Sequence, residues 1–185
     1  CGSQADDGAS DIDGHGTHVA GSVLGDGTNS SGNIKGMAPE AQLYFQAIGV
    51  WCANAATSPR DARYSLNGLP SNLTELFKAG ADNGSRVHTN SWGSAENGAY
   101  NTYSMQADIA ARNHDDLVIL FSAGNNGLDS DSDGEIDLDN IGAPGSAKNV
   151  MTIGASENYR PAVSGSALWG NWWPSDYPVN PINDD

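Results

Sequence analysis

Residues 13–21 read Asp-Gly-His-Gly-Thr-His-Val-Ala-Gly, a stretch that predicts a tight turn leading directly into a helix. Gly14 and Gly16 let the backbone crowd the histidine between them and adopt dihedral angles closed to bulkier residues. Small and apolar residues follow, which predicts a helix over about 15–24 that can pack closely on a sheet. His15 then lies in the first helical turn, where the helix dipole disfavours imidazolium and favours the neutral form that a general base needs.

The composition indicates one secreted, highly soluble domain. A chain of 185 residues is long enough for a single sizeable core. Its net charge of −15 argues against nucleic acid and anionic membrane surfaces as partners. The sequence holds no apolar run of the length that spans a membrane and no charged-then-apolar leader, so we expect any signal peptide to have been removed.

The two cysteines, Cys1 and Cys52, leave two readings open. In an extracellular protein a single pair most simply forms one disulfide, which here would close a long loop. Alternatively, each is a free buried thiol. The acidic, calcium-suited composition favours the extracellular setting and therefore the disulfide.

Strand and helix patterns alternate along the chain, and the strands are apolar throughout. This pattern is typical of a parallel sheet covered on both faces, so we expect a three-layer αβα fold of the α/β class. Ligands of such sheets bind beyond the carboxyl ends of the strands. Ser-Trp-Gly at 91–93 and Ser-Ala-Gly-Asn at 122–125 fall at two of these ends. The predicted helices are 15–24, 71–82 (with Ser71 as N-cap) and 103–114, and the predicted strands are 41–48, 86–90, 117–121 and 150–153.

Several short motifs occur in an order that carries a family resemblance. Gly-His-Gly-Thr-His-Val-Ala-Gly at 14–21 is followed by Gly-Met-Ala-Pro at 36–39, Asn-Ser-Trp-Gly at 90–93, Ser-Ala-Gly-Asn at 122–125 and Ala-Pro-Gly at 143–145. Together they resemble the subtilisin-like serine proteases, and their spacing most resembles the oxidatively stable alkaline relatives. The resemblance covers roughly residues 11–165 and implies a subtilisin-like fold that is incomplete in this chain.

The resemblance implies roles for individual residues. His15 would be the general base of a Ser-His-Asp triad, and Asn125 would donate to the oxyanion of the tetrahedral intermediate. The edge segment would pair with an extended polypeptide substrate. Small residues would line a roomy first specificity pocket; the alternative reading is that they serve tight packing of sheet on helix. The edge segment comprises Ser91, Trp92 and Gly93, and the pocket residues are Ser122, Ala123, Gly124 and Gly145.

Two triad members are missing from these residues. The family's aspartate lies in an upstream strand in an Asp-Thr/Ser-Gly context, which none of the aspartates before His15 has. Its nucleophile lies in Gly-Thr-Ser-x-Ala, a run that the chain does not contain. We therefore expect residues 1–185 to be part of one catalytic domain, with the Asp strand and the Ser segment supplied by other segments of the same protease.

An acidic loop after Asn125 matches the pattern Asp-x-Asp-x-Asp-Gly-x-x-Asp. Alternate carboxylates in such a loop converge on one Ca²⁺, while Gly134 permits the sharp turn. A solvated acidic loop is the other reading. The predicted calcium ligands are Asp129, Asp131, Asp133, Glu135 and Asp137.

The sequence thus predicts a secreted, calcium-stabilised, subtilisin-like serine endopeptidase that acts through an acyl-enzyme. The alternative is a catalytically inactive homologue that serves as an extracellular calcium-binding structural or interaction protein.

Overall fold

The computed structural model describes residues 11, 14–51, 64–65, 67–131 and 136–155. The chain divides into two compact units, Cys1–Ser85 and Arg86–Asp185, and each is described by itself. The predicted Cys1–Cys52 disulfide lies outside the described residues. Across the described ranges, no helix combines the length and the apolar character that a membrane crossing requires.

The first unit begins with the helix that carries the glycine-histidine motif. Its elements are α1 (His15–Leu24), the 3₁₀ helix η1 (Thr28–Ser30), β1 (Val50–Trp51), β2 (Tyr64–Ser65) and α2 (Leu73–Asp82). The bounds of α1 agree with the prediction, and none of its residues is buried. β1 and β2 form a short antiparallel pair, in a stretch where the sequence predicts neither a helix nor a strand.

The helix α2 follows its predicted amphipathic pattern. Leu73, Leu76 and Phe77 are buried on one face, as the spacing of apolar residues indicates. Its N-cap is Asn72 rather than the predicted Ser71, because the Asn72 side chain accepts a hydrogen bond of 3.2 Å from the backbone N–H of Thr74.

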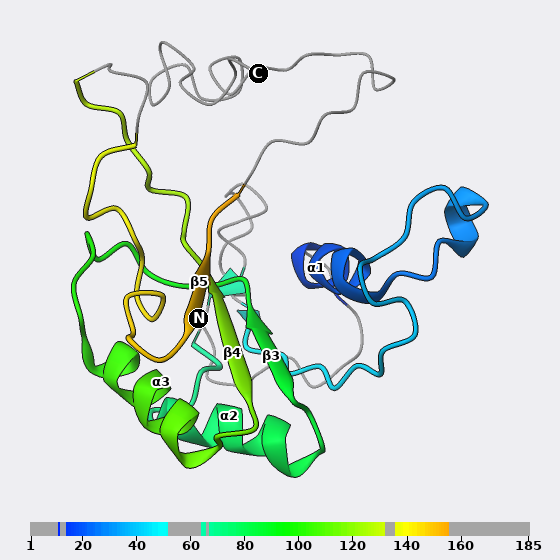
Figure 1. Cartoon of the computed structure of the whole chain (residues 1–185), viewed down its shortest axis with the longest axis horizontal. Helices are drawn as coiled ribbons and strands as arrows, with labels where there is room; N and C mark the ends of the chain where they lie inside the picture. The colour runs from blue at the N-terminus through cyan, green and yellow to red at the C-terminus, as the bar shows by residue number, and fades with distance from the viewer. Residues whose placement is uncertain (1–10, 12–13, 52–63, 66, 132–135, 156–185) are drawn as a thin grey trace. The chain divides into compact units, whose positions relative to one another are not determined.

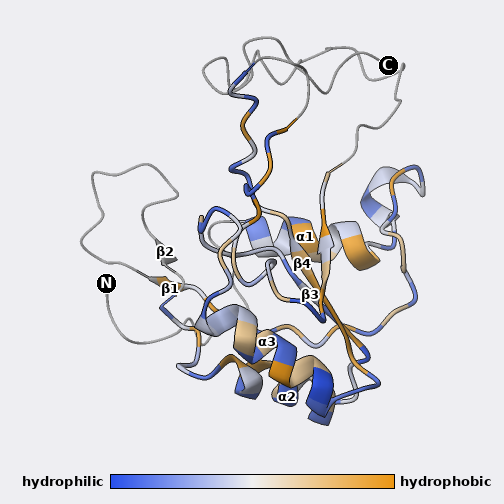
Figure 2. Cartoon of the chain, turned by 60° about the vertical axis from the view of Figure 1, so that its left-hand side comes forward, coloured by the Kyte–Doolittle hydropathy of each residue, from blue (hydrophilic) through white to orange (hydrophobic). Residues whose placement is uncertain are grey.

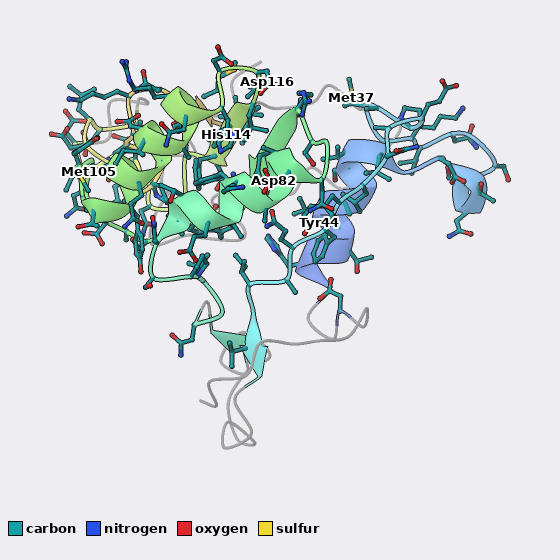
Figure 3. The ribbon with its side chains drawn as sticks, turned by 90° about the horizontal axis from the view of Figure 1, so that it is seen from below. Met37, Tyr44, Asp82, Met105, His114 and Asp116 are labelled. Atoms are coloured by element: carbon teal, nitrogen blue, oxygen red, sulfur yellow. The ribbon has the colours of Figure 1, made fainter. Side chains whose placement is uncertain are left out.

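The predicted buried strand over 41–48 is wrong. These residues form no strand, and Leu43 and Phe45 are 52% and 57% exposed. Met37 and Tyr44 project from the same segment after α1 (Figure 3), and Met37 is 92% exposed. The apolar run suits a strand, but a strand also needs a hydrogen-bonded neighbour. Within the described residues, the first strand pairing in this region begins at Val50.

The second unit contains a parallel sheet in the order β3-β4-β5 (Figure 1). Asn90 is in register with Phe121, and Phe121 is in register with Thr152. The three strands therefore end together, which confirms the predicted α/β class with a parallel sheet. The elements of this unit are β3 (Val87–Asn90), α3 (Thr102–Asn113), β4 (Val118–Ser122) and β5 (Met151–Ile153).

The helix α3 packs against β4 and covers one face of the sheet (Figure 1). Asn101 and Ser104 form a capping box at its start. Ala107 is fully buried on the helix, and Ile119 and Phe121 are 2% and 1% exposed on the strand. The apolar colouring along β4 in Figure 2 matches this buried stretch. The core of the second unit thus lies directly beneath the carboxyl ends of its strands.

Candidate active site

A buried amide fixes the chain where β3 ends. Asn90 is 3% exposed, and its Nδ2 donates to the carbonyl oxygens of Leu120 (2.9 Å) and His88 (3.3 Å). The indole Nε1 of Trp92 donates to Asn90 Oδ1 over 3.2 Å. The Trp92 ring also meets Phe121 edge to face, with centroids 5.3 Å apart and an interplanar angle of 81°. The predicted substrate-edge segment therefore leaves the sheet in a fixed direction.

Backbone hydrogen bonds join the segments that follow β3 and β4 to the segment around Gly142 and Ala143. Ser94 and Ala143 exchange two N–H···O bonds of 2.9 and 3.0 Å as an antiparallel bridge. The N–H of Gly142 donates to the carbonyl of Ala123 (3.0 Å), and the N–H of Ala123 donates to the carbonyl of Ile153 (2.9 Å). Three segments that are distant in sequence thus meet at one edge of the sheet, where ligands of parallel sheets bind.

Close backbone approach requires glycine at positions in this cluster. A Cβ on Gly93 would lie 2.9 Å from the carbonyl oxygen of Ala143, and one on Gly145 would lie 2.9 Å from that of Gly142. Gly145 is buried, which favours a packing role there. Ser122 is exposed, as is Gly124, so these two present surface at the end of β4.

Asn125 follows Gly124 in the loop after β4 and is exposed. Gly124 has φ +102°, a left-handed conformation that glycine tolerates without strain. The chain therefore turns sharply just before Asn125. No hydrogen bond ties the Asn125 side chain to the described part of the chain. Its amide is available to a ligand above the carboxyl end of β4.

His15 is the first residue of α1 in the other unit, and its side chain is exposed. Gly14 precedes it with φ +87°, and the carboxylate of Asp11 accepts the backbone N–H groups of Gly14 (2.9 Å) and Thr17 (2.6 Å). These bonds, chiefly that from Thr17, hold the pKa of Asp11 below its usual range. A carboxylate at this end of a helix also complements the helix dipole. Asp11 therefore fixes the turn that presents His15.

The acidic loop after Asn125 is closed by hydrogen bonds in its described part. Asp137 Oδ2 accepts the backbone N–H of Ser130 (3.0 Å), while the N–H of Asp137 donates to the carbonyl of Leu128 (2.8 Å). The interaction with Ser130 lowers the pKa of Asp137. Asn140 Nδ2 donates to the Asp137 carbonyl over 2.7 Å. Asp129, at the start of the loop, is 7% exposed.

The predicted calcium ligands are only partly described. Asp133 and Glu135 lie outside the described residues, whereas Asp129, Asp131 and Asp137 lie within them. Among the described residues, no three His, Cys, Asp or Glu side chains gather as a metal-binding group. The donor set is nevertheless all oxygen and rich in carboxylates, which fits the ligand preference of Ca²⁺.

Comparison with known proteins decides the family. The model of the subtilase family of peptidases matches residues 2–178. This chain belongs to the subtilase family. The subtilase chain is 29% identical over 180 residues to the subtilisin of Bacillus sp. (strain TA39), covering 91% of this chain and 36% of the relative. It is 30% identical over 159 residues to the serine protease AprX of Bacillus subtilis, covering 83% of this chain and 32% of the relative.

A much longer relative also matches the subtilase chain. The serine protease/ABC transporter B family protein tagD of Dictyostelium discoideum is 31% identical over 164 residues, which cover 85% of this chain and 8% of tagD. The chain therefore spans about a third of the bacterial relatives and under a tenth of tagD.

Two residues next to the candidate site of this subtilase chain are not among its predicted site residues. Asn90 stands directly before Ser-Trp-Gly, at the end of a predicted strand. An amide side chain at the end of a strand is a sequence signal that could have identified it. Asp11 stands three residues before Gly14, a spacing suited to capping the helix that follows. Each forms hydrogen bonds that fix the chain next to a predicted site residue.

Proposed function

We propose that the complete protein is a secreted serine endopeptidase, to which this chain contributes the general base and the oxyanion donor. His15 would take the proton from a serine hydroxyl as that oxygen attacks the peptide carbonyl, and would then return it to the leaving amine. Asn125 would donate a hydrogen bond to the oxygen that becomes negative in the tetrahedral intermediate. The serine and the aspartate that orients His15 would come from segments outside these 185 residues.

The proposal rests on the backbone hydrogen bonds that join the segments at the carboxyl ends of the strands. These bonds involve Ser94, Ala123, Gly142 and Ala143. A substrate-binding edge and a pocket wall must hold a fixed separation if a peptide is to lie across both. Backbone hydrogen bonds of 2.9–3.0 Å supply such a fixed separation here.

The substrate would be a polypeptide in an extended conformation. Ser91, Trp92 and Gly93 would pair with its backbone as an added strand, a mode in which main-chain hydrogen bonds give affinity. The first specificity pocket would be lined by Ser122, Ala123, Gly124 and Gly145. Small residues at these positions would leave room for a large apolar side chain.

Calcium would stabilise the loop that follows the oxyanion donor. Asp129, Asp131, Asp133 and Asp137 would supply carboxylates, and Glu135 would supply its backbone carbonyl. The hydrogen bond from Ser130 to Asp137 already closes part of this loop, which supports its ordering around one ion. We also propose that the protein is secreted and that Cys1 and Cys52 form a disulfide. Residues 1–185 would belong to one catalytic domain, related to the oxidatively stable alkaline subtilisins.

A serine-directed fluorophosphonate probe tests the proposal on the complete protein. We expect labelling of the wild type and a loss of labelling in His15→Ala, because the serine needs its base to attack the probe. His114→Ala provides the matched control, since His114 lies at the C-cap of α3, away from the strand ends. A folded complete protein that takes up no probe would instead support the inactive homologue.

A further inference from the structure

The buried amide of Asn90 suggests a role beyond packing. Burying an amide is unfavourable unless its donors and acceptor find partners. Here both donors reach backbone carbonyls, of Leu120 and His88, and the acceptor receives the indole N–H of Trp92. Bonds to two carbonyls, one on β3 and one on β4, fix the orientation of the amide. The amide oxygen is therefore a hydrogen-bond acceptor, held in a fixed orientation, for the indole N–H of Trp92.

Trp92 is in turn held on two sides. Its N–H is bonded to Asn90, and its ring meets Phe121 edge to face at 5.3 Å. Two residues further on, Ser94 is fastened to Ala143 by a pair of backbone bonds. The short segment that begins at Ser91 is thus fixed through a side chain at one end and through its backbone at the other.

We propose that Asn90 is a positioning residue that, through the indole of Trp92, holds Ser91, Trp92 and Gly93 in the geometry that pairs with an extended peptide substrate. The inference rests on the proposed function and extends it. A binding edge that is ordered before the substrate arrives avoids the entropy loss of ordering it on binding. Losing the amide–indole bond should therefore raise KM for substrates long enough to pair with this edge. It should leave kcat for those substrates nearly unchanged.

Two variants of the complete protease test this role, and Trp92→Phe is the sharper one. Trp92→Phe keeps an aromatic ring beside Phe121 but removes the N–H, and it leaves the bonds from Asn90 to the two carbonyls in place. Asn90→Ala removes the acceptor together with both donors. We expect each to raise KM for a peptide substrate of six or more residues by about fivefold, the effect of one ordinary hydrogen bond. For Asn90→Ala, which lies outside the binding edge, we expect hydrolysis of a short activated ester that does not reach this edge to change by less than about twofold.

The double variant and a matched control separate positioning from general destabilisation. Because both changes break one shared bond, the double variant should raise KM no further than Asn90→Ala alone. Tyr100→Phe removes another side-chain hydrogen bond of the same unit, from Tyr100 Oη to Asp108 (2.8 Å), and should leave KM for both substrates unchanged.

NMR measures the hydrogen bond between Trp92 and Asn90 without the need for a substrate. We expect the indole N–H resonance of Trp92, assigned by its loss in Trp92→Phe, to exchange slowly in the wild type and much faster in Asn90→Ala. This inference would be overturned, and the proposed function left standing, by either of two results in an active wild type. One is a KM for the long peptide that is the same in the wild type and both variants. The other is an indole N–H that still exchanges slowly in Asn90→Ala. A folded complete protein without peptidase activity would overturn the proposed function and this inference with it.

Discussion

His88 should make the second unit lose stability in mild acid. It lies on β3 in register with Ile119, and burial lowers its pKa from 6.5 to about 4, partly offset by a hydrogen bond with the Asn90 side chain. The folded state therefore holds His88 neutral at pH values where the unfolded chain already protonates it. Between pH 6.5 and 4 the unfolded state binds the extra proton, so the free energy of unfolding falls as the pH falls.

The size of this effect follows from the gap between the two pKa values. Each pH unit across the gap is worth about 1.4 kcal/mol, so a gap from 6.5 to about 4 corresponds to about 3 kcal/mol. The contribution is fully present above pH 6.5 and is lost below about pH 4. A loss of this size is a large fraction of the total stability of a typical domain.

Urea unfolding of the wild type and of His88→Gln at half-unit steps from pH 7.5 to 4 measures the effect. Carboxylates elsewhere titrate equally in both proteins, so they cancel in the difference between the two curves. We expect the wild type to lose about 3 kcal/mol more than His88→Gln over this range. Parallel curves, or a His88 ring proton that titrates near pH 6.5 by NMR, would refute the argument that burial keeps this imidazole neutral.

Four further outcomes are expected. Asn125→Ala should lower kcat of the complete protease by about 10²–10³ with little change in KM, as measured on a peptide substrate. Asp11→Ala should cost about 1 kcal/mol in urea unfolding because α1 loses its capping carboxylate, whereas Glu40→Ala, on an exposed turn residue, should be neutral. Asp108→Ala should cost about 1–3 kcal/mol, since this carboxylate accepts two backbone N–H groups and a tyrosine hydroxyl. Chelation of calcium should lower the melting temperature of the wild type and change that of Asp129→Asn much less, and a wild type whose melting temperature does not respond to the chelator would argue against the ion.

The helices could be predicted because their signals are local. The apolar spacing of α2 and the small-residue run of α1 lie within the elements themselves, so the sequence alone indicates them. The cap of α2 shows the limit of this reasoning. Ser71 and Asn72 are both good capping residues, and only the backbone geometry selects Asn72.

The strands could be predicted only where a partner exists. The run 117–121 is apolar and finds β3 and β5 on its two sides, so the prediction of β4 is confirmed to within a residue. The run 41–48 is also apolar, yet it forms no ladder in the described residues. Periodicity reports which residues suit a strand, whereas hydrogen bonding to a neighbour determines whether the strand forms.

The candidate site is a consequence of strand register, which no local pattern encodes. Parallel strands in register end at one edge, so the segments after β3 and β4 and the segment that includes Gly142 and Ala143 meet there. The register Asn90↔Phe121 then places the indole of Trp92 against the ring of Phe121, 29 residues away in sequence. A shift of one residue would turn Phe121 to the opposite face and separate the two rings. The sequence therefore predicts which residues form the candidate site, while the amide of Asn90, which donates to the carbonyl of Leu120 on β4, fixes the geometry of the segment after β3.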